Sequence, residues 1–117
     1  MILTNGEKLY LYKKRHNGTL NGIAVNYCVG YGMAHLWMTD KRKMPNSLYK
    51  KVAPIKPTDC EELVLKRRRA GLKMKEVADM LGICHITVIN IEKGLYTLSG
   101  DAYKLLINNA YDEYENN

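Results

Sequence analysis

Residues 71–94, GLKMKEVADMLGICHITVINIEKG, decide how the second half of the chain folds. Apolar residues recur there at helical spacing on both sides of a short turn. The spacing predicts one helix over Met74–Leu81 and another over residues 85–93. Gly82 suits a turn conformation that a side chain would oppose, and Gly94 suits the position that ends the second helix. Two short helices joined in this way form a helix-turn-helix.

The apolar residues of this stretch have distinct expected roles. Ala78 is small, so the first helix can cross close to the second, and Ile83 is expected to fill the angle between them. Val88 and Ile91 are expected to hold the second helix on a core. Its other face would then be free for the major groove of DNA.

The stretch resembles the Cro/repressor type of helix-turn-helix, also called the xenobiotic-response-element type, of the lambda-repressor-like family. That pattern reads roughly G-L-S-Q-x-x-L-A-x-x-L-G-V-S-x-x-x-I-S-x-I-E-x-G. The segments that fall in register without a gap are Val77-Ala78, Leu81-Gly82-Ile83, Val88 and Ile91-Glu92-Lys93-Gly94. The resemblance implies a helical DNA-binding domain over about residues 60–115, with residues 85–93 in the major groove.

The chain departs from the family pattern at three positions. Lys73 stands where the first helix usually has a Ser cap, and Met74 replaces a Gln typical of phosphate contact. Lys73 or Lys75 is the expected substitute for that contact. Cys84 is a weak acceptor at the cap of the second helix, so a poorer cap is expected.

The resemblance also implies which side chains would meet DNA. Asn90 can pair with adenine, His85 and Thr87 can donate to guanine or phosphate, and Ile86 or Ile89 can meet a thymine methyl. One of these isoleucines could instead belong to the core. The full expected set is Lys73, Lys75, Cys84, His85, Ile86, Thr87, Ile89, Asn90 and Lys93.

Helices are also expected around this motif, over residues 61–70 after a cap at Asp59 and from about Asp101 to Tyr114. Four consecutive cations, residues 66–69, spread around the first of these helices, so they cannot all face DNA. The last helix carries an apolar stripe that predicts a homodimer interface or, alternatively, closes the core of one chain. The stripe comprises Tyr103, Leu106, Ala110 and Tyr114.

Upstream, the pattern favours strands. Residues 23, 25, 27, 29 and 31 are apolar and alternate with smaller or polar residues, which is typical of a strand with one buried face. The segment His16-Asn17-Gly18-Thr19 carries an Asn-Gly hairpin signal. We therefore expect an antiparallel β meander over residues 7–39 and an α+β fold class. The predicted organisation is a basic β-rich region 1–53, a Pro-flanked linker 54–58 and a helical domain 59–117. The sequence shows no internal repeat.

Charge is divided unequally between these parts. Residues 1–58 contain ten basic and two acidic side chains, a balance of +8, whereas residues 59–117 contain eight basic and ten acidic ones, a balance of −2. A strongly basic segment indicates a polyanionic partner. Lys13, Lys14 and Arg15, at the expected hairpin tip, are therefore predicted to make a second DNA contact.

Composition excludes several other classes. The apolar runs are far shorter than the ~20 residues that span a membrane, and no signal peptide is apparent at the N-terminus. The three cysteines are widely spaced and form no metal-binding pair. No catalytic grouping emerges, so we expect no enzyme, no cofactor and no metal, and a cytoplasmic, nucleoid-associated protein.

The function expected from these observations is sequence-specific DNA binding by a small, repressor-like transcriptional regulator of phage or mobile-element type. An antitoxin that binds both an operator and a toxin is the alternative, with the N-terminal region as the toxin-binding part. A phage factor that inhibits a host protein while retaining the fold is a third possibility.

Overall fold

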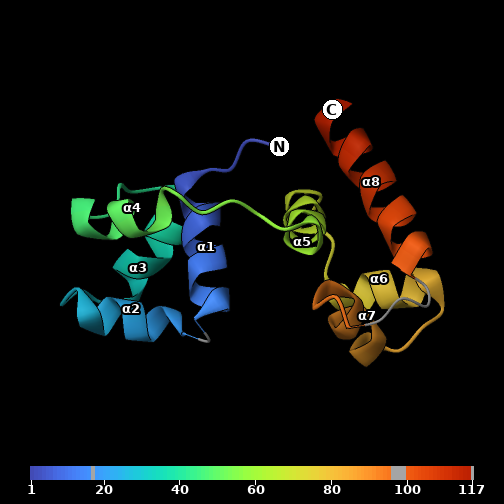
Figure 1. The fold of residues 1–117 in the computed structure, drawn as a ribbon, viewed down its shortest axis with the longest axis horizontal. Coiled ribbons are helices and arrows are strands. Elements are labelled where there is room, and N and C mark those ends of the chain that lie inside the picture. The colour runs from blue at the N-terminus through green and yellow to red at the C-terminus, as the bar shows by residue number, and fades with distance from the viewer. Residues whose placement is uncertain (17, 96–99, 117) are drawn as a thin grey trace. The chain divides into compact units, whose positions relative to one another are not determined.

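The computed structural model describes residues 1–16, 18–95 and 100–116, and within them the chain forms eight α-helices and no strand (Figure 1). The chain folds as two compact units, Met1–Lys56 and Pro57–Asn117, which we call unit 1 and unit 2. Unit 1 consists of α1 (Asn5–Arg15), α2 (Leu20–Asn26), α3 (Tyr31–Met38) and α4 (Asn46–Val52). Unit 2 consists of α5 (Asp59–Arg69), α6 (Met74–Leu81), α7 (His85–Glu92) and α8 (Gly100–Asn116).

The predicted β meander, and with it the α+β fold class, is wrong. The apparent alternation over residues 23–31 crosses the end of α2, a turn and the start of α3. Ile23 and its neighbour Ala24 are both buried, whereas Val25 is 67% exposed, so no single face of a strand exists. The expected hairpin signal lies between α1 and α2, where Asn17 is outside the described residues and Thr19 caps α2.

Unit 1 is built on its own core. Its helices begin at local signals: Thr4 and Glu7 form a capping box at the start of α1, and the Thr19 hydroxyl accepts from the Gly22 N–H at 3.0 Å. Their buried faces meet around Trp37, whose ring contacts that of Tyr27 edge-on. The other buried core residues are Leu9, Leu20, Ile23, Ala24, Ala34, Met44, Leu48 and Val52.

Unit 2 contains the four helices expected from the sequence, with small shifts at their ends. Helix α5 begins at Asp59 behind a capping box formed by Thr58 and Glu61, so Thr58 and not Asp59 is its cap. Helix α6 has the expected bounds, and α8 extends to Asn116. Buried side chains from α6, α7 and α8 form the core: Val77, Ala78, Val88, Ile91, Tyr103 and Ile107.

The two units repeat one helical arrangement, although the sequence shows no internal repeat. Helices α1–α4 begin at residues 5, 20, 31 and 46, and α5–α8 begin at residues 59, 74, 85 and 100, each 54 residues later. The packing repeats as well: α1 packs on α3 and α4, and α2 on α3, as α5 packs on α7 and α8, and α6 on α7. Unit 1 is therefore a helical counterpart of unit 2.

Candidate nucleic-acid interface

Helices α6 and α7 meet as the sequence predicted. Val77 and Val88 are fully buried and Ala78 is 2% exposed, so the two helices approach closely. Gly82 adopts a left-handed φ of 66° at the end of α6, a conformation that costs glycine little. Ile83 packs against the same core. This arrangement packs one side of α7 against the core and leaves His85 and Ile86 exposed.

A buried polar network fixes the end of α7. Glu92, its last residue, accepts a hydrogen bond from Arg67 Nε on α5 at 2.7 Å. Tyr103 on α8 donates its hydroxyl to the same carboxylate oxygen, and Arg67 Nη1 donates to the Leu72 carbonyl at 2.8 Å. Burial, together with the bond to Glu92, raises the pKa of Tyr103, so the hydroxyl stays protonated as a donor. Hydrogen bonds to the Glu92 carboxylate thereby connect α5 and α8 to α7.

The open side of α7 carries the predicted base-reading residues. His85 and Ile86 are exposed, and Ile86 is 69% accessible despite its apolar side chain. Thr87, Ile89 and Asn90 are half-buried, so neither isoleucine is a core residue. On the same helix Val88 and Ile91 are buried, so Ile86 is the most exposed of the large apolar side chains on α7.

The predicted phosphate-binding residues lie at the start of α6 and the end of α7. Lys73 precedes α6, Lys75 lies in its first turn and Lys93 follows α7, and all three are exposed. Glu76 Oε1 accepts from the Lys73 N–H at 3.3 Å and so caps α6 from within the helix. Cys84 caps α7 without a side-chain hydrogen bond, which confirms the poorer cap expected there.

The four cations at residues 66–69 have different surroundings. Arg67 is buried in the network described above. Lys66 Nζ donates to Asn108 at 3.1 Å and Arg69 donates to the Tyr111 hydroxyl at 3.0 Å, both on α8. Arg68 is exposed. The sequence carries no local signal that joins Arg67, Glu92 and Tyr103, because their contact is made only by the packing of three helices.

The cations expected at a hairpin tip lie instead on the last turn of α1, a place that the helix dipole favours. The ammonium groups of Lys13 and Lys14 lie 5.3 and 5.7 Å from the centre of the Tyr10 ring. Arg15 donates to the carbonyl oxygen of Lys56.

The residues predicted to form a dimer interface have different surroundings. Tyr103 is fully buried in the core of unit 2. Leu106 and Ala110 are half-buried, and Leu106 packs against that same core. Tyr114 is 51% exposed and its ring stacks on that of Tyr111. Part of the stripe thus serves the fold of its own unit.

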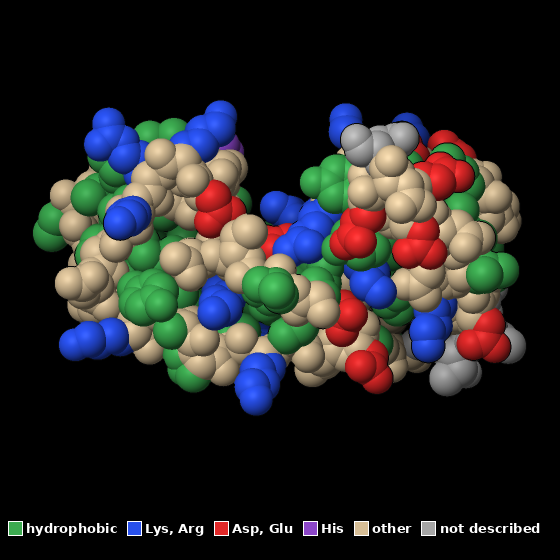
Figure 2. Space-filling view, turned by 90° about the horizontal axis from the view of Figure 1, so that it is seen from above, with side chains coloured by type: hydrophobic (Ala, Val, Ile, Leu, Met, Phe, Trp, Pro, Cys, Tyr) green, Lys and Arg blue, Asp and Glu red, His purple; other side chains and the backbone are tan. Residues whose placement is uncertain are grey.

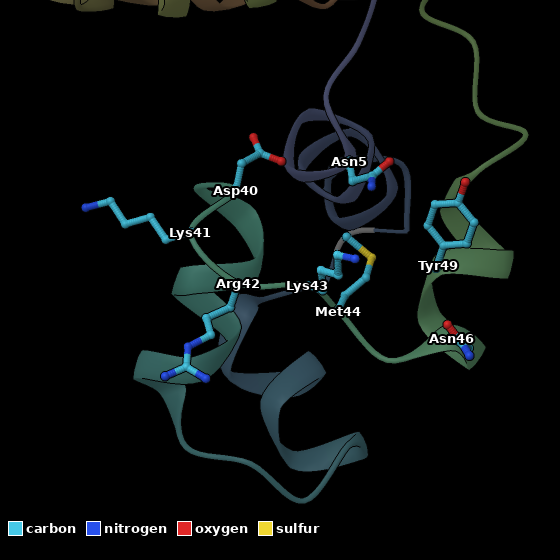
Figure 3. Close-up of a pocket in the computed structure, with 8 residues that line it drawn as sticks. All are labelled: Asn5, Asp40, Lys41, Arg42, Lys43, Met44, Asn46 and Tyr49. Atoms are coloured by element: carbon cyan, nitrogen blue, oxygen red, sulfur yellow. The ribbon is translucent and has the colours of Figure 1, made fainter.

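A second group of exposed cations lies in unit 1. Lys41, Arg42 and Lys43 follow α3 and line an open depression of about 450 Å³. Figure 3 shows Lys41 and Arg42 reaching outward in different directions, so they do not converge on one small ligand. Figure 2 shows acidic side chains gathered mainly on unit 2. The sequence shows the same division of charge. Residues 1–56 carry ten basic and two acidic side chains, whereas residues 57–117 carry eight basic and ten acidic ones.

None of the described helices is both long and apolar enough to cross a membrane. Comparisons with protein-family models, with curated proteins and with solved structures found no match for this chain.

Proposed function

We propose that the protein binds double-stranded DNA in a sequence-dependent manner and regulates transcription, with α7 entering the major groove. The observation that carries the proposal is the surface of α7. Its inner side is held by Val88, Ile91 and the buried Glu92, while His85 and Ile86 are exposed and Asn90 is half-buried. Residues 71–94 also resemble the Cro/repressor type of helix-turn-helix.

The chemistry of this surface suits base reading. Asn90 offers a donor and an acceptor that match adenine N6 and N7, and Ile86 offers an apolar surface for a thymine methyl. Lys73 and Lys75 at the start of α6 and Lys93 after α7 are exposed and can neutralise phosphates. The rigid support of α7 would position these groups without a large cost in ordering.

The proposal is tested by selecting binding sequences from random duplex DNA with the full chain and then measuring the affinity of Asn90→Ala. We expect the variant to bind the selected sequence more weakly by about 1–3 kcal/mol and random DNA almost as well as before. Asn109→Ala, the same substitution at an exposed position on α8, is the control and should change neither affinity. An unchanged ratio of specific to random binding in Asn90→Ala would contradict the role of α7.

A further inference from the structure

We propose that unit 1 is a second helix-turn-helix, with α3 as its recognition helix, so that a single chain reads two different DNA half-sites. The inference extends the function proposed for α7, and it starts from the repeated arrangement of helices in the two units.

The turn between α2 and α3 has the backbone geometry of the turn between α6 and α7. Cys28 has a φ of 54° where Gly82, 54 residues later, has 66°, and Asp40 has 63° where Gly94 has 75°. Left-handed φ is uncommon for residues other than glycine. Cys28 and Asp40 are the two such residues in the described part of the chain, and both fall at positions equivalent to glycines of unit 2.

The supporting contacts of the two motifs also correspond. In each unit an alanine preceded by a β-branched residue is buried on the first helix of the motif, and two buried apolar residues hold the second helix. The equivalent pairs are Ile23 and Val77, Ala24 and Ala78, Val29 and Ile83, Ala34 and Val88, and Trp37 and Ile91.

A further contact repeats where the first helix of each unit meets the end of the third. The Gly6 N–H donates to Asp40 Oδ1 at 2.8 Å. At the equivalent positions of unit 2, a Cβ placed on Gly94 would lie 3.4 Å from Cys60 Sγ. The same two positions thus lie next to each other in both units.

The outward side of α3 is available for a ligand and differs chemically from that of α7. Tyr31, 57% exposed, and His35 are accessible, and their rings stack with centroids 6.4 Å apart. They occupy the positions equivalent to His85 and Ile89. Hydroxyl and imidazole groups can hydrogen-bond to base edges or phosphates, so α3 is expected to prefer a different base sequence from α7.

The charge around α3 favours DNA over an acidic protein as its ligand. Helices α2, α3 and α4 contain no acidic residue, Lys41 and Arg42 extend outward just beyond α3, and Lys43 next to them is exposed. Of the two acidic residues in unit 1, Glu7 caps α1 and Asp40 accepts from Gly6. A basic surface that spreads its cations apart suits a row of phosphates.

The test uses the full chain and random duplex DNA. We expect the selected sequence to contain two unlike half-sites, with one chain per duplex as measured by analytical ultracentrifugation. Tyr31→Ala/His35→Ala should weaken binding by about 5- to 150-fold and relax base preference in one half-site only, while Asn90→Ala relaxes the other. The fluorescence of Trp37, the chain's single tryptophan, reports whether unit 1 remains folded. If the double alanine variant unfolds, Tyr31→Phe/His35→Gln replaces it.

Two double variants that remove the same charge distinguish direct phosphate contact from a general effect of net charge. Lys41→Ala/Lys43→Ala should weaken binding to every sequence and lower the salt slope by about two, if each lysine contacts one phosphate. Lys50→Ala/Lys56→Ala removes the same charge from exposed positions of unit 1 and should lower the slope less.

Any of four results would overturn the inference. A single selected half-site that responds to Asn90→Ala and not to the α3 variants would leave the proposed function of α7 intact and remove the second site. Two chains bound to two copies of one half-site would show a dimer in place of a tandem reader. Unchanged DNA binding by Lys41→Ala/Lys43→Ala would point to an acidic protein partner for unit 1. Failure of the full chain to select any sequence would remove both proposals.

Discussion

At the residue scale, the carboxylate of Glu92 determines how firmly α7 is held. It lies in a site where the side chains of both Glu92 and Arg67 are at most 9% exposed, and it also accepts from Tyr103. Removing one member of a buried ion pair leaves the other charged and without its partner, which is far more costly than the loss of an exposed pair.

We therefore expect Glu92→Ala to lower the free energy of unfolding of unit 2 by about 3–5 kcal/mol. Circular dichroism during heating should show early loss of part of the helical signal, while Trp37 fluorescence from unit 1 keeps its transition. Glu62→Ala breaks the more exposed pair with Lys66, at 3.7 Å, and should cost less than about 1 kcal/mol. Equal effects of the two variants would show that the buried network contributes no special stability.

At the element scale, the packing of α1 on α3 depends on the absence of a side chain at Gly6. A Cβ there would lie 2.2 Å from the Met38 carbonyl oxygen, which belongs to the backbone and cannot move aside cheaply. Gly32, on the outer side of α3, has no atom within 4 Å of the corresponding position. The same substitution should therefore have opposite effects at these two glycines.

We expect Gly6→Ala to destabilise unit 1 by about 1–3 kcal/mol or more because the helices must separate. Gly32→Ala should stabilise it by about 0.5–1 kcal/mol because alanine loses less conformational entropy in a helix. Denaturant titration followed by Trp37 fluorescence measures both. A neutral Gly6→Ala would mean that α1 and α3 are not packed backbone to backbone.

At the scale of the whole molecule, charge is divided between two units of one arrangement. Unit 1 carries +8 and unit 2 carries −2. The salt dependence of DNA binding counts the phosphates that the protein neutralises, not the net charge of the protein. Unit 1 holds the excess of cations, so we expect it to contact more phosphates than unit 2 does and to supply most of the electrostatic part of the affinity. The cations expected to make these contacts are Lys41, Arg42 and Lys43 and those in the last turn of α1.

Replacing Lys13, Lys14 and Arg15 together by alanine should weaken binding to all sequences. The slope of log affinity against log salt should fall by about one for each phosphate that the variant no longer neutralises. The control changes net charge by the same amount in the opposite direction: Asp112→Asn, Glu113→Gln and Glu115→Gln on α8. These exposed residues should affect the slope little. A larger effect from the α8 variant would mean that overall charge, not contact by unit 1, governs binding.

The sequence by itself determined the helices of unit 2, because every signal there is local. Gly82 and Gly94 mark their turns with the residue that best tolerates a positive φ, and Val77, Ala78, Val88 and Ile91 recur at helical spacing. The inward positions of Val88 and Ile91 on α7 followed from the same periodicity, whereas the bond between Arg67 and Glu92 joins residues 25 positions apart and depends on packing.

Only the tertiary structure decided that unit 1 is helical and that it repeats unit 2. Its turns are made by Cys28 and Asp40, which give no glycine signal, and the alternation from Ile23 to Tyr31 matches a strand as well as two helix ends. Few equivalent residues are identical, among them Thr4 and Thr58, Glu7 and Glu61, and Ala24 and Ala78. Burial selects side chains that fill a given space and not particular residues, so Trp37 can replace Ile91 in the same role. The strain of a positive φ at Cys28 and Asp40 is offset by contacts such as that between Asp40 and Gly6, which exist only once the helices have packed.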